Sequence, residues 1–231
     1  MMDTLPPLMT RGRAGLPREE TAASISLPRW EWRIFAHDLS RHRALRDACV
    51  LAVDSPQMDT YLLSRRATDS VKVRDGELQI QSLLERSPDG LERWSMRYTA
   101  PFPLSATDLA VVYAAWGLTD AAPKVSRCGP DALRTQIVSR HPDLRAVDVH
   151  KQRTRIEVCG CAGEQVALLI DGAPWESLAF ASTNPSLVLA AVTSLGHRAQ
   201  ENEPYGAALM RITAFTPADD RAGIVTRSLR S

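Results

Sequence analysis

The sequence predicts an α+β fold in which about eight antiparallel strands form a closed or nearly closed β-barrel with peripheral helices. Three observations lead to this prediction. Short runs of alternating polar and apolar residues recur along the chain, turn sequences separate several of them, and helical spacing is confined to the segments between and after them. A chain of 231 residues can bury one good core.

The ends of the chain differ from its middle. Residues 1–27 contain several prolines and scattered charges without a sustained period, so we expect a flexible N-terminal arm. Residues 28–214 are expected to form the barrel domain, and residues 215–231 a loose C-terminal tail.

Composition limits the function classes. The net charge of +1 argues against general attraction to nucleic acid or to anionic membranes, and no apolar run reaches spanning length. The four cysteines are too sparse for a disulfide scaffold, which favours a cytoplasmic location. An anion site must therefore come from local clustering of charge.

The first half of the chain predicts a strand, a short helix and a meander. The first strand begins at Pro28 and alternates charged with apolar residues, and a short helix is expected over His37–Cys49. Asp75-Gly76 is a strong two-residue hairpin signal, because glycine adopts a positive φ without steric cost. The strands of the meander are expected at Gln57–Ser64, Ser70–Arg74, Glu77–Arg86 and Leu91–Thr99.

The second half predicts helices on both sides of three further strands. Ser105 is expected to cap a helix that reaches Trp116, and Asn184-Pro185 has the residues of a helix start. Further helices are expected at residues 131–140 and 205–211, and further strands at residues 146–158, 164–170 and 176–182.

Basic residues at a spacing of two recur on four of the predicted strands. Side chains two apart in a strand share a face, so each row places its cations on one side of the sheet. Any single row could be a solvated outer face, but one enclosed polyanion accounts for all four rows. The register of the third row is ambiguous. The rows are Arg29 with Arg33, Lys72 with Arg74, Arg93 with Arg97, and Lys151 with Arg153 and Arg155.

The order of these segments resembles the CYTH superfamily, the triphosphate tunnel proteins related to thiamine triphosphatase and class IV adenylyl cyclase. The resemblance is carried by RWEWRIF, DTYLLS, SVKVRDGELQI and VHKQRTRIEV, followed by GEQVALLID, ESLAFAST and a leucine-rich helix. It covers about residues 28–212. The resemblance implies a basic barrel interior that grips a triphosphate or polyphosphate, with acidic residues that hold Mg²⁺ or Mn²⁺.

The candidate site combines residues that match the family motifs with further charged residues of the predicted strands, namely Arg97, Glu157 and Glu164. Glu31 and Lys151 are the catalytic candidates, and Glu31, Glu157 and Glu164 are the metal candidates. The phosphate-binding candidates are Arg33, Lys72, Arg74, Arg97, Lys151, Arg153 and Arg155.

The acidic motif is incomplete. Arg29 stands where the family has the first acid of its opening Glu-x-Glu-x-Lys motif, and Ala181 and Thr183 stand near the last strand where it usually has acids. Gln79 and Gln81 occupy a region where the family tends to have a lysine.

Two functions therefore stay open. One is a tunnel protein that binds a triphosphate-type anion and hydrolyses it as a metal-dependent triphosphatase. The other is a degenerate barrel that acts as a phosphate-ligand sensor, or as an interaction module that reaches a protein partner through its termini. Cys159 and Cys161 could join a histidine in a metal site, but they are more simply small residues at a turn.

Overall fold

The computed structural model describes residues 27–39, 45, 48–119 and 126–215. The predicted arm and tail lie outside the described residues except for Leu27 and Phe215, and so does most of the predicted helix over His37–Cys49. Phe215 is buried with a cluster of apolar residues at the end of the last helix.

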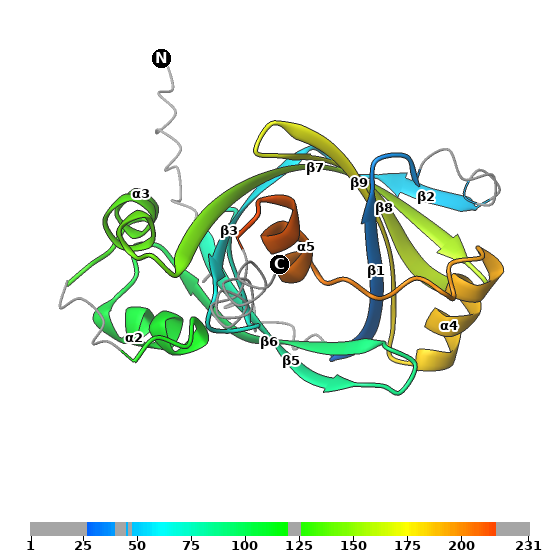
Figure 1. The fold of residues 1–231 in the computed structure, drawn as a ribbon, viewed down its shortest axis with the longest axis horizontal. Helices are drawn as coiled ribbons and strands as arrows, with labels where there is room; N and C mark the ends of the chain where they lie inside the picture. The colour runs from blue at the N-terminus through cyan, green and yellow to red at the C-terminus, as the bar shows by residue number, and fades with distance from the viewer. Residues whose placement is uncertain (1–26, 40–44, 46–47, 120–125, 216–231) are drawn as a thin grey trace, which may run out of the picture.

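Nine strands form one antiparallel sheet within the described residues. Because β7 pairs with both β3 and β8, every strand except β2 takes part in a closed ring of hydrogen-bonded pairs (Figure 1). The strands are β1 (Arg29–Ala36), β2 (Cys49–Val53), β3 (Gln57–Ser64), β4 (Ser70–Arg74), β5 (Glu77–Arg86), β6 (Glu92–Pro101), β7 (Leu144–Val158), β8 (Cys161–Ile170) and β9 (Ala173–Ser182).

The meander and its turns agree with the sequence prediction. Asp75 and Gly76 both have positive φ, at 50° and 78°, as the two-residue turn between β4 and β5 requires. The prediction missed β2, whose five residues are all exposed and show no alternation of polar and apolar side chains. The strand β9 also begins three residues earlier than predicted, at Ala173.

The helices lie outside the wall of the ring or across its opening. Ser105 and Asp108 form the capping box of α2 (Ala106–Ala115), and Asn184 caps α4 (Pro185–Ser194), as their sequences predict. The predicted helix at residues 131–140 is divided into α3 (Pro130–Ala132), a π-helical segment (Leu133–Ile137) and a 3₁₀ turn (Val138–Arg140).

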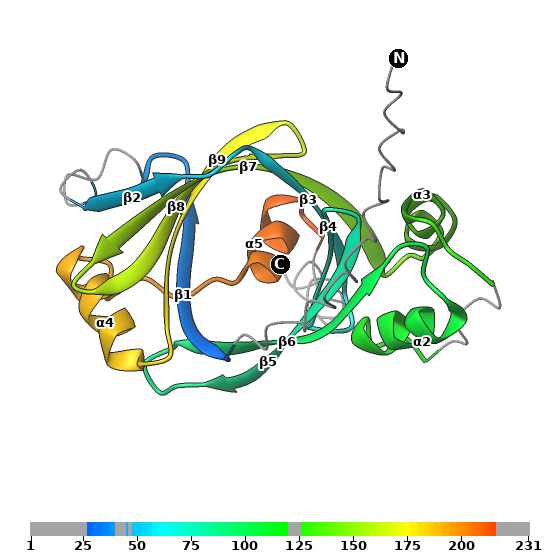
Figure 2. The ribbon, with the colours of Figure 1, turned by 180° about the vertical axis from the view of Figure 1, so that it is seen from behind.

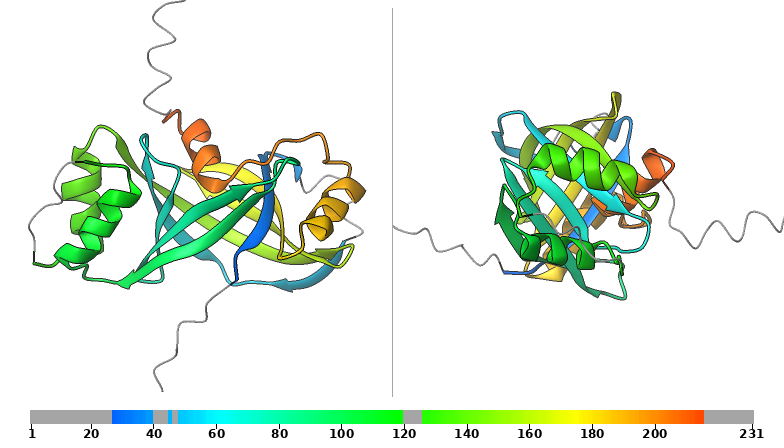
Figure 3. Two further views of the ribbon diagram at one scale, coloured as in Figure 1. Left: turned by 90° about the horizontal axis from the view of Figure 1, so that it is seen from below. Right: turned by 90° about the vertical axis from the view of Figure 1, so that its left-hand side faces the viewer.

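Each group of helices covers its own apolar cluster. The helices α2 and α3 lie at one end of the ring and α4 lies at the other (Figure 3). The last helix, α5 (Tyr205–Ile212), is seen within the opening of the ring from both sides (Figure 1, Figure 2). Among the described residues, no helix combines the length and the apolar character needed to cross a membrane.

Candidate functional site

The ring encloses a cavity of about 1250 Å³, to which all eight of its strands and α5 contribute residues. Apolar side chains such as Leu83, Trp94 and Phe180 form part of the lining. Cations form much of the rest, because the alternation of the strands turns three of the four predicted basic rows inward. The predicted cations that line this central cavity are Arg29, Arg33, Lys72, Arg74, Lys151, Arg153 and Arg155.

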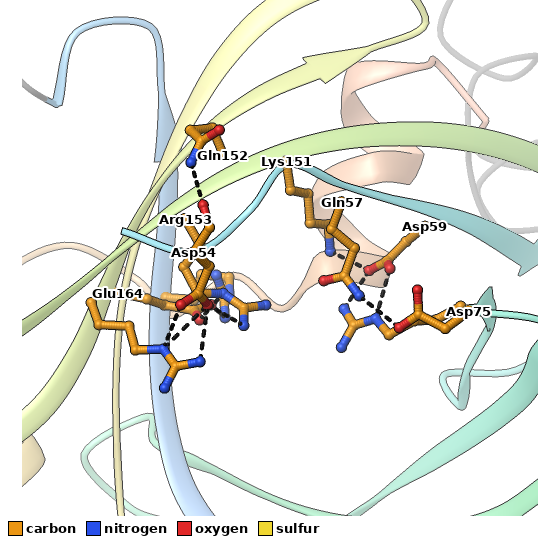
Figure 4. A network of polar contacts seen from close by, with 11 residues as sticks. Asp54, Gln57, Asp59, Asp75, Lys151, Gln152, Arg153 and Glu164 are labelled. Atoms are coloured by element: carbon orange, nitrogen blue, oxygen red, sulfur yellow. Dashed lines mark hydrogen bonds and ion pairs between the residues drawn. The ribbon is translucent and has the colours of Figure 1, made fainter. Parts of the chain in front are cut away.

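The first polar network centres on Asp59 of β3, which is fully buried. Its Oδ1 accepts a hydrogen bond from Arg74 Nε at 2.7 Å, and its Oδ2 accepts from Arg74 Nη2 at 2.5 Å and from Lys151 Nζ at 2.6 Å (Figure 4). Lys151 Nζ also donates to Tyr61 Oη at 2.9 Å. Burial alone would raise the pKa of Asp59, but hydrogen bonds and charge from Arg74 and Lys151 hold it well below its usual range.

The second polar network centres on Glu164 of β8. Arg33 Nη2 donates to Glu164 Oε1 at 2.7 Å, and Arg153 Nε lies 2.9 Å from Oε2 in an ion-pair contact. The small side chain of Ala179, paired with both Arg33 and Glu164, lets the guanidinium cross β9. Burial raises the pKa of Glu164, but the charges of Arg33 and Arg153 outweigh this effect and lower it to about 2.

The second network continues to Asp54, in the turn between β2 and β3. Arg153 Nη1 lies 3.4 Å from Asp54 Oδ2, and Arg155 Nε lies 2.9 Å from Asp54 Oδ1. Figure 4 shows Glu164, Arg153 and Asp54 as a group separate from Asp59 and Lys151. A ligand that contacts both networks must therefore present negative charge at more than one position.

Lys72 is a buried lysine that these carboxylates leave unpaired. It lies opposite Tyr61 in the β3–β4 register, and its Nζ is 6.0 Å from the centre of that ring. The residue is 7% exposed, and it has no hydrogen-bonded or ion-paired partner among the described residues. Burial, reinforced by the charges of Arg74 and Lys151, lowers the pKa of Lys72 to about 7. A negatively charged phosphate oxygen beside Nζ would stabilise the protonated lysine against both its burial and the charges of Arg74 and Lys151.

Two tyrosine rings, Tyr205 of α5 and Tyr61 of β3, lie next to the cations of the cavity. Tyr205, the first residue of α5, stacks on Tyr61 with ring centres 5.2 Å apart. The Nζ of Lys151 lies 4.0 Å from the centre of the Tyr205 ring, and Arg33 Cζ lies 4.5 Å from it. These contacts fix cations of both networks from the same side.

Three predicted residues bear on metal binding, and only two of them line the cavity. Glu31 and Glu164 face it, whereas Glu157 is exposed on β7 and is absent from the lining. Glu164 already has two guanidinium partners, Arg33 and Arg153. Glu31 has no ion pair among the described residues. No group of three or more His, Cys, Asp or Glu side chains suited to a metal forms within the described part of the chain. These donors do not fit a divalent ion held by the protein alone.

The carboxyl group of Glu31 has an unusual environment. Burial raises its pKa; the charges of Arg33 and Arg29 oppose this rise, and the charge of Glu164 adds to it. The group therefore takes up a proton more readily than an ordinary glutamate, inside a cavity lined with cations.

The third basic row, Arg93 with Arg97, lies away from the cavity. Arg97 Nη1 pairs with Asp69 Oδ2 at 3.1 Å, and Arg93 Nη1 lies 3.5 Å from Glu85 Oε2. The opposite face of β6 turns inward, so that Glu92 and Trp94 line the cavity instead. The sequence analysis missed Asp54, Asp59 and Tyr205, because their partners Arg153, Lys151 and Tyr61 lie far from them along the chain.

Comparisons with known proteins found matches among solved structures only. No family model matches the sequence, and no curated protein matches it. HpAC1 from Hippeastrum, a candidate adenylyl cyclase with a dominant triphosphatase activity, matches with 11% identity and a TM-score of 0.43, over 80% of this chain and 96% of that chain. PH1012 from Pyrococcus horikoshii matches with 14% identity and a TM-score of 0.39, over 77% and 94%.

A candidate adenylate cyclase from Bacillus halodurans is similar to the same extent. It matches with 11% identity and a TM-score of 0.39, over 78% of this chain and 95% of that chain. At such identities and TM-scores the three matches carry no argument about this chain.

Proposed function

We propose that the central cavity binds the phosphate chain of a triphosphate or a short polyphosphate. The observation that carries the proposal is Lys72, a buried cation without a counter-ion among the described residues, next to Arg74 and Lys151. Unpaired buried cations are costly unless an anion joins them. Phosphate oxygens are suitable anions, because guanidinium groups bind them through two parallel hydrogen bonds.

The two networks favour an extended anion over a single phosphate. One presents Lys72, Arg74 and Lys151, and the other presents Arg33, Arg153 and Arg155. Asp59 and Glu164 already neutralise part of the positive charge of each network. A ligand that contacts both networks therefore gains more binding free energy than one that contacts a single network. A chain of phosphoryl groups has the required repeat of negative charge.

The test is a calorimetric titration with sodium tripolyphosphate in EDTA, with sulfate at matched ionic strength as the reference anion. Wild-type protein is expected to bind tripolyphosphate in preference to sulfate. Arg153→Glu should abolish this binding, because it places a carboxylate beside Glu164 and Asp54. Arg97→Glu is the matched control, since it makes the same charge change at a residue outside the cavity. Equal loss of binding in both variants would place the site elsewhere.

Hydrolysis of the bound anion is a second candidate function, and Glu31 is the observation that favours it. A cavity carboxyl with a raised pKa and no ion pair among the described residues is suited to accept a proton from an attacking water. Phosphate release should be measured from tripolyphosphate, thiamine triphosphate and nucleoside triphosphates, with Mg²⁺ or Mn²⁺ and without either. Loss of turnover in Glu31→Gln with binding retained would support a triphosphatase. Binding without turnover in the wild type would instead support a sensor.

A further inference from the structure

We propose that Asp59 is a built-in counter-ion of the anion site, which positions Arg74 and Lys151 and limits the negative charge that the central cavity accepts. This inference rests on the proposed function. It concerns a residue that makes no direct contact with the ligand, because Asp59 is fully buried and is absent from the lining of the cavity.

The hydrogen bonds of Asp59 fix the two cations without exhausting their donors. Its two oxygens accept three bonds from Arg74 and Lys151, at 2.5 to 2.7 Å. Lys151 Nζ uses one more donor on Tyr61, which leaves one of its three N–H groups. Arg74 Nη1 has no hydrogen bond among the described residues, so both cations still have donors for a ligand.

Asp59 also sets the charge that a ligand meets. Without it, Lys72, Arg74 and Lys151 would be three cations with no carboxylate among them; with it, two positive charges remain uncompensated when all are protonated. A buried cation that loses its partner destabilises the fold strongly. The neutral variant Asp59→Asn keeps the shape of the side chain, but it removes the negative charge and replaces one accepting oxygen by an NH2 donor.

The expected signature is rescue by anions. Asp59→Asn should unfold at a lower temperature than wild type in EDTA without phosphate. Tripolyphosphate should then raise its Tm by more than it raises that of wild type, because the ligand supplies the missing negative charge. We expect the excess rise to be about 6 °C or more. Sulfate at matched ionic strength should produce a smaller excess.

The matched control is Asp148→Asn. Asp148 is also a strand aspartate with an arginine partner, but it accepts from Arg134 and Thr60 away from the cavity. Its variant should lose some stability, and tripolyphosphate should raise its Tm by the same amount as in wild type.

A second variant separates charge balance from folding. Asp59→Asn combined with Arg74→Gln removes one charge of each sign, so it should be more stable without phosphate than Asp59→Asn alone, and the excess response to tripolyphosphate should disappear. If Asp59→Asn alone does not fold in buffer, it should fold when it is refolded with tripolyphosphate.

The outcomes distinguish the two proposals. A wild-type protein that tripolyphosphate does not stabilise would refute the proposed function and this inference with it. A wild-type response with an equal or smaller response in Asp59→Asn would refute only the role of Asp59. A double variant as unstable as Asp59→Asn would refute it too, since charge balance would then not explain the loss.

Discussion

Replacing Lys72 by methionine is expected to stabilise the protein and to weaken its anion binding at the same time. The lysine is 7% exposed and has no ion-paired partner among the described residues, while burial and neighbouring cations lower its pKa from 10.5 to about 7. Methionine is an unbranched side chain that fills much of the same space without a charge. The change therefore removes an electrostatic cost and keeps most of the packing.

The size of the effect follows from the pKa shift. Because the pKa is lower in the folded state than in the unfolded state, the charge opposes folding most strongly below pH 7, and this cost is relieved as the pH rises toward 10.5. At pH 7 it amounts to about 4 kcal/mol, which corresponds to roughly 8 to 16 °C in Tm. Loss of one charge-assisted hydrogen bond should weaken tripolyphosphate binding by about 10- to 100-fold.

The assay combines denaturant unfolding at several pH values with calorimetric titration of tripolyphosphate. Wild-type stability should rise between pH 7 and pH 10 by more than that of Lys72→Met, which lacks this titrating group. Lys151→Met is the comparison, because it leaves Asp59 without one of its partners and should destabilise the fold. A Lys72→Met protein that is less stable than wild type and binds tripolyphosphate equally well would refute the reasoning.

Three further predictions concern pH, packing and the outer face. Tripolyphosphate affinity should fall as the pH rises above 7, where free Lys72 loses its proton, and Lys72→Arg should flatten this fall in calorimetric titrations. Gly163→Ala should lower the free energy of unfolding by about 1 to 3 kcal/mol, because its Cβ would lie 2.5 Å from a ring carbon of Phe180; an unchanged denaturation midpoint would contradict this packing. Glu157→Gln should leave tripolyphosphate affinity unchanged, and a large loss would show that the exposed face of β7 takes part in binding.

The sequence was sufficient to predict eight of the nine described strands and the direction of three basic rows. Alternation along β7 placed Lys151, Arg153 and Arg155 on one face, and the structure turns that face into the cavity. The same logic was not sufficient for Arg97. The β5–β6 pairing contains two register shifts, and a shift of one residue exchanges the inward and outward faces of a strand.

The partners of the cations could not be predicted from local sequence. Asp59 meets Lys151 across 92 positions of the chain, and Arg33 meets Glu164 across 131. Only the pairing of strands distant in sequence shows that Glu164, a metal candidate in the sequence analysis, is neutralised by arginines. The same pairing places Lys72 next to the Asp59 network without a carboxylate partner among the described residues.

The most direct measurement is a crystal structure of the protein with tripolyphosphate in the absence of divalent metal. We expect phosphate oxygens within hydrogen-bond distance of Lys72 Nζ and of the free guanidinium nitrogens of Arg74 and Arg153. Phosphate bound only at the exterior, with Lys72 still buried and uncontacted, would contradict the claim that these cations form an anion site.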